Sequence, residues 1–276
     1  MSQGATRLVA RGKTKQILQF VDEPDTCRVV SLDAITALDG KKRHVMPGKG
    51  KLSNRLAANT FELLKRRGIP VAFISQDGPD SFVAPYCRMV PLEIVVRWRA
   101  REKSSYRKRN PSTPPEQAFD RPVVELFLKT SGQKWRGVDI PCDDPLLVLN
   151  SDPGLLDAFL PNKPLAEQEP LLTIAIDDLE LSDEQVVEIY KLAEKVGVAL
   201  KEAWAHVEAE LDDFKMEVGI TRDKKILVAD VIDNDSHRLT YRGEDVSKQG
   251  YRDDRDMALV TKNYVLVTRL SELFPQ

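Results

Sequence analysis

Residues 211–239 read Leu211-Asp-Asp-Phe-Lys-Met-Glu-Val-Gly-Ile220, then Thr221-Arg-Asp-Lys-Lys225, then Ile226-Leu-Val-Ala-Asp-Val-Ile-Asp-Asn-Asp-Ser-His-Arg-Leu239. In the first segment charged and apolar side chains alternate from Asp213 to Val218, which is the period of a strand with one buried face. The third segment opens with four consecutive apolar residues, which favours a strand buried on both sides. Because the middle segment is polar and rich in turn formers, the whole stretch predicts a β-hairpin.

This hairpin is rich in charged side chains. Asp213, Lys215 and Glu217 share the polar face of the first strand, and Asp230 ends the apolar run of the second. Two carboxylates brought close together repel each other, and a hard cation such as Mg²⁺ relieves that repulsion. The spacing is equally consistent with a solvated sheet face on which Lys215 neutralises its neighbours.

The composition predicts a soluble globular protein. A chain of 276 residues lies near the ~250–300 residues that one core can serve, so one domain with two lobes or two small domains is expected. The formal charge of −2 gives no global electrostatic reason to bind nucleic acid or an acidic membrane. The three cysteines are widely separated, and no apolar stretch is long enough for a membrane span, which predicts a cytoplasmic protein with reduced thiols.

The hairpin resembles the signature of the phosphoribosylaminoimidazole-succinocarboxamide synthase (SAICAR synthetase) family. The segment from Asp230 to Ser236 is most similar to the branch fused to an aminoimidazole ribonucleotide (AIR) carboxylase, although no carboxylase domain is expected before Gln276. Matching motifs follow in order from about Leu8 to Leu270. The resemblance implies an α+β protein with two lobes: a β-rich ATP-binding lobe over residues 1–90 and an α+β substrate and metal-binding lobe over residues 91–276, with ATP in the cleft between them.

The resemblance also implies an activity. ATP would activate the carboxylate of 5-amino-1-(5-phosphoribosyl)imidazole-4-carboxylate (CAIR) as an acyl phosphate, which the amine of L-aspartate attacks. Lys215, Glu217 and Asp230 would form the catalytic centre, and Glu217 and Asp230 would hold Mg²⁺. The expected partners are therefore small molecules, with neither nucleic acid nor membrane among them, and a homo-oligomer is possible.

The segment Gly12-Lys13-Thr14-Lys15 contains two candidate phosphate contacts. A P-loop would need a glycine where Arg7 stands and a helix directly afterwards, so that motif is rejected. From the residues alone, Lys13 and Lys15 are either solvated at a hairpin tip or placed over nucleotide phosphates. The resemblance implies the second role, with backbone groups near Met89 and Val90 meeting the adenine.

Substrate contacts are implied by the resemblance at several positions. In the family a Thr-Gly-Ser segment precedes Lys-Arg-Asn-Pro, and its serine and an upstream arginine hold the substrate 5′-phosphate. Here Glu102-Lys-Ser-Ser105 precedes Lys108, so two residues are inserted and the glycine is absent. The implied substrate residues are Asp39, Glu93, Arg97, Ser105, Asp144, Arg238, Lys248 and Arg252.

Two other functions stay open at this point. The altered Arg101–Ser105 loop is compatible with a paralogue that amidates a different carboxylate, for example in nucleoside natural-product synthesis. A non-catalytic nucleotide- or RNA-binding protein is the other alternative, because residues 97–109 carry seven basic side chains interleaved with Trp98 and Tyr106.

The scaffold is predicted to contain three long helices. The first runs from about Leu52 and ends before Gly68, and the last runs from Met257 to Leu270. Between them, Ser182 and Gln185 form a capping box that opens a helix in which Gly197 is a tolerated weak point. Residues 146–177 show no clean periodicity. His237 stands where relatives carry a bulky aromatic residue.

Overall fold

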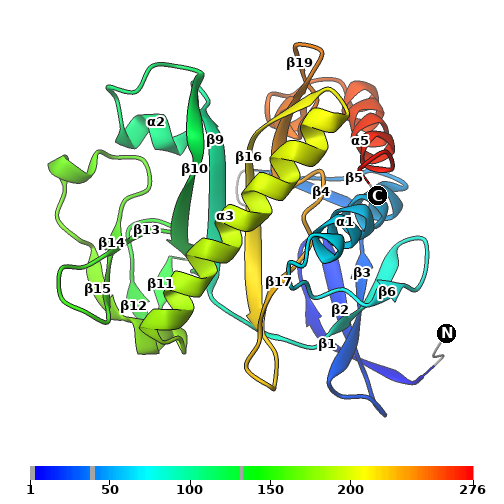
Figure 1. The fold of residues 1–276 in the computed structure, drawn as a ribbon, viewed down its shortest axis with the longest axis horizontal. Coiled ribbons are helices and arrows are strands. Elements are labelled where there is room, and N and C mark those ends of the chain that lie inside the picture. The colour runs from blue at the N-terminus through cyan, green and yellow to red at the C-terminus, as the bar shows by residue number, and fades with distance from the viewer. Residues whose placement is uncertain (1–3, 38–40, 131–132, 276) are drawn as a thin grey trace. The chain divides into compact units, whose positions relative to one another are not determined.

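A computed structural model describes residues 4–37, 41–130 and 133–275 (Figure 1). The chain divides into two compact units: unit 1 consists of Met1–Arg88, Ala199–Leu211 and Gly219–Gln276, and unit 2 of Met89–Val198 and Asp212–Val218. Unit 1 therefore also includes C-terminal residues, whereas the predicted lobes have a single boundary after residue 90. Helices and antiparallel sheets are both present, so the α+β prediction is confirmed.

The largest sheet within unit 1 has five antiparallel strands in the order β1-β2-β3-β7-β6. Its first three strands form a meander, because consecutive strands pair antiparallel across short polar turns. A separate hairpin joins β4 (Ala34–Ala37) to β5 (Lys42–Val45). The sheet strands are β1 (Thr6–Arg11), β2 (Lys15–Phe20), β3 (Thr26–Ser31), β6 (Ser75–Gln76) and β7 (Ser81–Pro85).

Two of the predicted helices pack together in unit 1: α1 (Lys49–Arg66) and α5 (Met257–Ser271). The rings of Phe61, Phe73 and Phe82 lie 5.4 to 5.8 Å apart between α1 and the sheet, which gives this unit an aromatic core. Helix α1 ends as predicted, since Gly68 adopts a φ of 70° that a residue with a Cβ takes up only at a cost. The short helix α4 (Gln249–Arg252) precedes α5.

Unit 2 is built on one antiparallel sheet in the order β15-β14-β13-β10-β9-β16. Its outer three strands form within the segment that showed no periodicity, and two short 3₁₀ turns, Leu165–Glu167 and Ile176–Leu179, interrupt that segment. The strands are β9 (Leu92–Ala100), β10 (Gln117–Leu128), β13 (Leu146–Leu149), β14 (Leu155–Phe159), β15 (Leu172–Ala175) and the middle of β16 (Ala209–Ile220). The short helix α2 (Ser105–Arg109) lies in the connection from β9 to β10, and β11 (Lys134–Trp135) pairs with β12 (Val138–Asp139) apart from the sheet.

The helix α3 (Asp183–His206) follows the predicted capping box. The backbone N–H of Ser182 donates to Gln185 Oε1 at 3.0 Å, and the N–H of Gln185 donates to Ser182 Oγ at 3.3 Å. Gly197 is more than a tolerated weak point. A Cβ at this position would lie 2.8 Å from Val96 Cγ1, so the absence of a side chain lets the helix backbone approach β9, where the Trp98 indole N–H donates to the Gly197 carbonyl.

The predicted hairpin is present as β16 and β17 (Ile226–Ala229), which pair with each other. The alternative of a fully solvated charged face does not hold, because Asp213 and Glu217 are each only 6% exposed, although the Lys215 side chain between them is 42% exposed. The remaining strands are β8 (Arg88–Met89), which pairs with β16, β18 (His237–Tyr241) and β19 (Glu244–Asp245).

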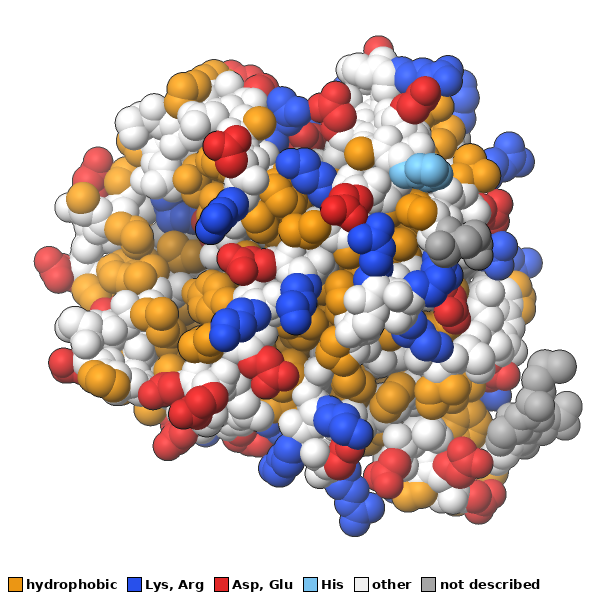
Figure 2. Space-filling model, viewed as in Figure 1, with side chains coloured by type: hydrophobic (Ala, Val, Ile, Leu, Met, Phe, Trp, Pro, Cys, Tyr) orange, Lys and Arg blue, Asp and Glu red, His pale blue; other side chains and the backbone are white. Residues whose placement is uncertain are grey.

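The visible surface mixes charges of both signs (Figure 2). Acidic and basic side chains are interspersed on that face, in keeping with a formal net charge of −2. Among the residues that the structure describes, no helix combines the length and the apolar character that a membrane crossing needs.

Candidate active site

Unit 1 brings two of the predicted functional residues into direct contact. Lys15, the first residue of β2, forms an ion pair with Asp230, whose side chain is 29% exposed. Asp230 directly follows the buried strand β17 and has a φ of 57°, a left-handed conformation in which the chain turns sharply. A predicted ATP contact and a predicted metal ligand therefore lie at one place, where the lysine neutralises the carboxylate.

Unit 2 contains a similar pair around the other predicted metal ligand. Lys129 Nζ lies 2.7 Å from Glu217 Oε2, and the lysine side chain is 42% exposed whereas the glutamate side chain is 8% exposed. The lysine stem lies at the end of β10 and reaches the carboxylate from the solvent side. Glu217 is thus a buried acid whose charge is balanced by a movable lysine.

A second lysine pair lies on the same sheet. Lys215 Nζ lies 2.9 Å from Glu93 Oε2. The charges of both residues affect the pKa of Asp144, which Glu93 raises and Lys215 lowers. Burial is the main reason that the pKa of Asp144 is raised above its usual value, while a hydrogen bond from the Thr130 N–H opposes the shift. The structure therefore brings three predicted residues of unit 2 together: Lys215, Glu93 and Asp144.

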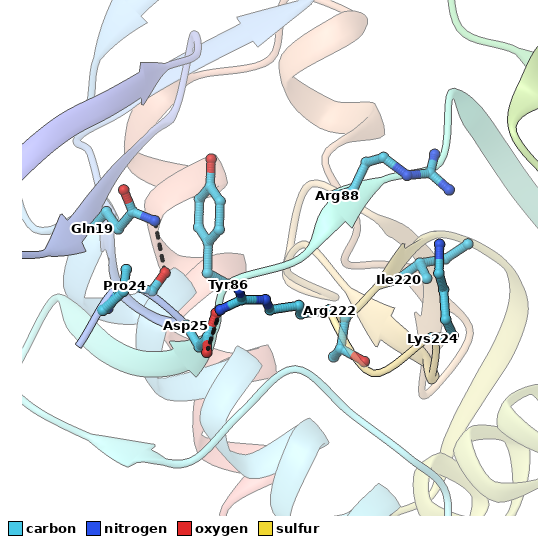
Figure 3. A pocket seen from close by; sticks show the side chains of 9 residues that line it. Gln19, Pro24, Asp25, Tyr86, Arg88, Ile220, Arg222 and Lys224 are labelled. Atoms are coloured by element: carbon cyan, nitrogen blue, oxygen red, sulfur yellow. Dashed lines mark hydrogen bonds and ion pairs between the residues drawn. The ribbon is translucent and has the colours of Figure 1, made fainter.

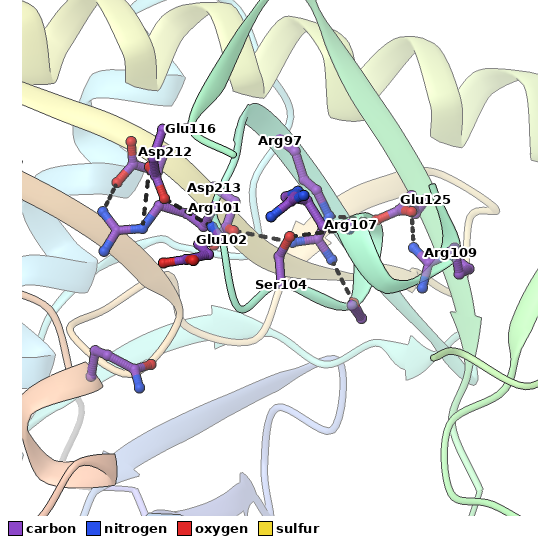
Figure 4. A network of polar contacts seen from close by, with 12 residues as sticks. Arg97, Arg101, Glu102, Ser104, Arg107, Arg109, Glu116, Glu125, Asp212 and Asp213 are labelled. Carbon is purple, nitrogen blue, oxygen red and sulfur yellow. Dashed lines mark hydrogen bonds and ion pairs between the residues drawn. The ribbon is translucent and has the colours of Figure 1, made fainter. Parts of the chain in front are cut away.

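Arg97 lies at the centre of a buried network (Figure 4). Its Nε donates to Glu125 Oε2 at 2.5 Å, its Nη1 to Asp213 Oδ2 at 3.1 Å and its Nη2 to Ser105 Oγ at 3.2 Å. Burial alone lowers the pKa of Arg97, but the charges of Glu125 and Asp213 outweigh burial and the net shift is upward. Arg109 forms an ion pair with the other oxygen of Glu125. Arg97 and Ser105, which the resemblance implies as contacts of the 5′-phosphate, are hydrogen-bonded to each other.

The basic run over residues 97–109 is largely neutralised inside unit 2. Asp212, which is 1% exposed, accepts hydrogen bonds from Arg99 Nε and Arg101 Nη1, each at 2.8 Å. Burial raises the pKa of Asp212, although both arginines favour its ionised form. Arg107 Nε donates to the Thr113 carbonyl at 2.9 Å. The run is therefore mainly a set of internal contacts rather than a solvated basic patch.

A buried charge cluster in unit 1 surrounds Asp235. Lys49, 1% exposed, lies 3.0 Å from one carboxylate oxygen, while Lys248 at 3.5 Å and the Tyr264 hydroxyl at 2.5 Å reach the other. Burial raises the pKa of Asp235, but the two lysines and the tyrosine outweigh burial, and the pKa falls to about 2. Burial together with Arg252 and Lys49 lowers the pKa of Lys248 despite Asp235. Lys248 is thus an internal partner of the motif that also carries Arg238.

His237 packs as an aromatic residue. It is 4% exposed, and its ring meets Trp204 edge-on with the ring centroids 5.4 Å apart. The imidazole thus fills an aromatic position in the core by packing against the edge of an indole.

Val90 and Met89, the two residues expected near adenine, differ in burial and in their backbone hydrogen bonds. Val90 is buried, its N–H donates to the Val218 carbonyl at 3.0 Å, and its carbonyl accepts from Leu92 at 2.7 Å. Met89 is 40% exposed. Because both backbone groups of Val90 are used within unit 2, the geometry favours Met89 for a contact with a ligand.

A cavity of about 460 Å³ opens in unit 1 beside the residues that directly precede Met89 (Figure 3). Tyr86 and Arg88 line it together with Ile220 at the end of β16, and Arg222 and Lys224 add two further cations. Arg222 lies 3.6 Å from the Asp25 carboxylate. Lys15 and Asp230 are not among its lining residues, so this cavity and the lysine pair are separate features of unit 1.

Several predictions about the site stay predictions. Asp39 lies outside the described residues. Lys13 is exposed in the turn between β1 and β2, and Arg252 lies in α4, where its Nη1 donates to Gln249 Oε1 at 3.3 Å. Glu217 and Asp230 belong to different units, as do Arg97 and Arg238, so their joint action on a metal or a phosphate stays untested. Among the described residues no group of three or more His, Cys, Asp and Glu side chains is placed to hold a metal ion.

Sequence reasoning missed important partners. For Glu125 and Lys129, a glutamate within the apolar run from Val123 to Leu128 was the available signal for a buried ion pair. Lys49 had no such signal, because Lys51 stands two residues away in the same glycine-rich passage and is exposed. The sequence does not indicate which of these two lysines is buried.

Comparisons with known proteins agree on one family. The model of the SAICAR synthetase family matches residues 8–137 and 163–265. The "Probable multifunctional protein ADE2" of Caenorhabditis elegans is 33% identical over 275 residues, which is 97% of this chain and 58% of that protein. The chain thus spans little more than half the length of that relative. It is also 34% identical over 259 residues to the phosphoribosylaminoimidazole-succinocarboxamide synthase of Roseiflexus sp. (strain RS-1), covering 92% of this chain and 88% of that enzyme.

A solved structure supports the same conclusion. The structure described as a type-2 SAICAR synthetase in complex with ADP superimposes with a TM-score of 0.71 at 26% identity, covering 97% of this chain and 99% of that chain.

Proposed function

This chain belongs to the SAICAR synthetase family, and we propose that it is an ATP-dependent ligase that joins L-aspartate to the carboxylate of CAIR in purine biosynthesis. The observation that carries the proposal is the lysine–carboxylate pairing within each unit: Lys15 with Asp230, and Lys129 with Glu217. In each pair the lysine can leave its carboxylate and contact a phosphate of the substrate instead.

The proposed reaction has two steps. A carboxylate oxygen of CAIR attacks the γ-phosphorus of ATP, so that a new P–O bond forms as the bond to ADP breaks. The amine of L-aspartate then attacks the acyl carbon, inorganic phosphate leaves with the bonding electrons, and the amine loses a proton. Catalysis of this kind consists mainly of positioning and charge neutralisation, because the substrates supply the nucleophiles.

The residues take the following roles in the proposal. Lys13 and Lys15 contact the ATP phosphates, and Lys215 lies with Glu93 and Asp144 where the acceptor carboxylate and the aspartate would meet. Arg97 and Ser105 bind the 5′-phosphate of CAIR, with Arg238 as the predicted second guanidinium. The cavity beside Tyr86 supports placing the adenine end of ATP near Met89.

The donors present fit Mg²⁺. This ion prefers oxygen ligands, keeps several waters and is commonly held by one or two carboxylates together with substrate phosphates. Glu217 and Asp230 are carboxylates, and each forms an ion pair with a lysine. When bound, Mg²⁺ would neutralise charge on the transferring phosphoryl group.

Turnover tests the proposal directly. We expect ADP release to require CAIR and L-aspartate together, with the succinocarboxamide product formed in a one-to-one ratio to ADP. Omission of either co-substrate is the matched control. Turnover with a different imidazole or pyrazole carboxylate, and none with CAIR, would instead favour the paralogue that the altered Arg101–Ser105 loop suggested. Salt-sensitive RNA binding without any turnover would contradict the ligase proposal altogether.

A further inference from the structure

The connection between β9 and β10 is the part of this chain that departs most clearly from its family motif. The ladder fixes it at its base, where Ala100 pairs with Gln117 and Arg99 with Ala118. Ser104 and Ser105 lie inside this connection, and Ser104 Oγ accepts the N–H of Arg107 at 3.3 Å as the N-cap of α2. The position of both serines therefore depends on how the base of the connection is held.

Asp212 is buried against that base (Figure 4). One of its carboxylate oxygens accepts from Arg99 Nε and the other from Arg101 Nη1, and both distances are 2.8 Å. The arginine side chains are 30% and 24% exposed, whereas the aspartate side chain is 1% exposed. Charge-assisted contacts to both oxygens of a buried acid fix its geometry more strongly than contacts in solvent do.

Glu116 ties the other end of the connection to the same arginines. Its carbonyl accepts from Arg99 Nη1 at 3.3 Å, and its carboxylate lies 3.9 Å from Arg101 Nε. The same carboxylate accepts the backbone N–H of Glu102 at 2.8 Å. Each arginine thus links Asp212 on β16 to Glu116 at the far end, which braces the entry and the exit of the connection against a third strand.

The next residue of β16 acts on the interior of the connection. Asp213 pairs directly with Arg97 in the ladder, and Arg97 in turn donates to Ser105 Oγ at 3.2 Å. Neighbouring acids of one strand therefore hold different parts of one loop: Asp212 holds its base, and Asp213 holds its serine through Arg97.

We propose that Asp212 is a positioning residue that, through Arg99 and Arg101, sets where Ser105 meets the 5′-phosphate of the acceptor nucleotide. This inference rests on the proposed function. The bracing takes over the role of the absent glycine, because a connection that cannot bring its backbone close to a phosphate must place a side-chain hydroxyl accurately instead.

The test compares Arg101→Gln and Asp212→Asn with Lys134→Gln, a control in an exposed ion pair of the same unit. Arg101 is the main test position, since its partial exposure lets the variant fold even if Asp212→Asn does not. We expect the KM for CAIR to rise about tenfold while kcat and the KM for ATP change less than twofold. Amide hydrogen exchange over residues 102–110 should become faster in the variants only, and restoring the acid as Asp212→Glu should recover part of the KM.

The outcomes separate the two proposals. If the unmodified protein shows no turnover with CAIR, the proposed function fails, and the exchange rates still report whether the bracing exists. If it turns over and Arg101→Gln changes neither the KM for CAIR nor the exchange of residues 102–110, the positioning role is wrong. An equal rise in the KM for ATP would also overturn it, because that result indicates general damage to the fold.

Discussion

Both the arginine network around Arg97 and the lysine pairs around Glu217 and Asp230 consist of ion pairs with carboxylates. The two regions differ in how far the basic side chains are exposed to solvent. The side chains of Arg97, Arg109, Glu125 and Asp213 are all 3% to 8% exposed, whereas the side chain of Lys129 is 42% exposed and that of Lys15 is 19% exposed. Removing one partner from a pair in which both side chains are buried leaves an unpaired charge without water, whereas a lysine near solvent regains its own hydration when it leaves its carboxylate.

This difference in exposure suggests different roles for the two sets of ion pairs. We infer that the arginine network holds the unit 2 sheet and its loop in one arrangement, and that the lysines are the groups that change partners when phosphates arrive. Variants of the two regions should therefore fail in different ways, the first in stability and the second in turnover.

The largest effect is expected from Arg97→Gln, measured without substrate. It removes the cation that Glu125 and Asp213 share and leaves Arg109 as a partner of Glu125, and breaking a buried pair in this way costs about 3–5 kcal/mol. Urea unfolding monitored by circular dichroism gives the free energy of unfolding. Arg136→Gln, in the exposed pair with Asp178, is the control and should stay within about 1 kcal/mol of the unmodified protein. A loss in Arg97→Gln no larger than in this control would remove the distinction.

Glu217→Gln should lower kcat by about 10² while the free energy of unfolding changes little, because the amide keeps the shape but not the charge that Mg²⁺ needs. Lys129→Gln is the informative comparison in steady-state assays. If Lys129 is only the partner of Glu217 before substrates bind, its removal should lower kcat less than tenfold. Equal losses in the two variants would show that the lysine stays in place throughout the reaction.

Asp235 tests whether a buried lysine cluster behaves like the buried arginines. Its pKa is about 2 in the folded protein and about 3.9 when unfolded, so the stability it contributes is present above pH ~4 and is lost as the pH falls toward 2. Across that window the unmodified protein should lose about 2 kcal/mol more than Asp235→Asn does. Unfolding curves at several pH values measure the difference, and the exposed Asp139→Asn should follow the unmodified protein.

The smallest effect is expected from Lys15→Ala. Loss of one charged contact should weaken ATP binding about tenfold and leave adenosine binding unchanged, because adenosine has no phosphates to meet the lysine. Isothermal titration calorimetry with both ligands measures the two affinities. An equal loss for ATP and adenosine would point to a folding defect and count against a phosphate contact.

Most regular elements could be predicted from the chain itself. The spacing of apolar residues and the residues that cap or end an element are local signals. They located β16 with β17, the capped start of α3 and the glycine that ends α1. Residues 146–177 resisted prediction because prolines and short strands leave too few residues for a period to emerge. Those strands acquire their pairing from partners elsewhere in the sheet.

The site was predictable in part. Motif order supplied the lysines and acids, and the pairs Lys215–Glu93 and Lys15–Asp230 bring predicted residues together. The depth of burial was not predictable. Asp213 alternates with apolar neighbours just as an exposed residue would, and only the arginine reaching it from β9 shows that it lies inside.

The division of β16 between the units has a consequence for the order in which the protein is made. Unit 1 contains residues after 218, whereas the residues of unit 2 end at Val218. The strands β1, β2, β3 and β7 pair with one another, so this sheet can form early, whereas β17 and α5 join unit 1 only after residue 218. Unit 1 should therefore close after unit 2, as expected for a chain of this size that folds unit by unit.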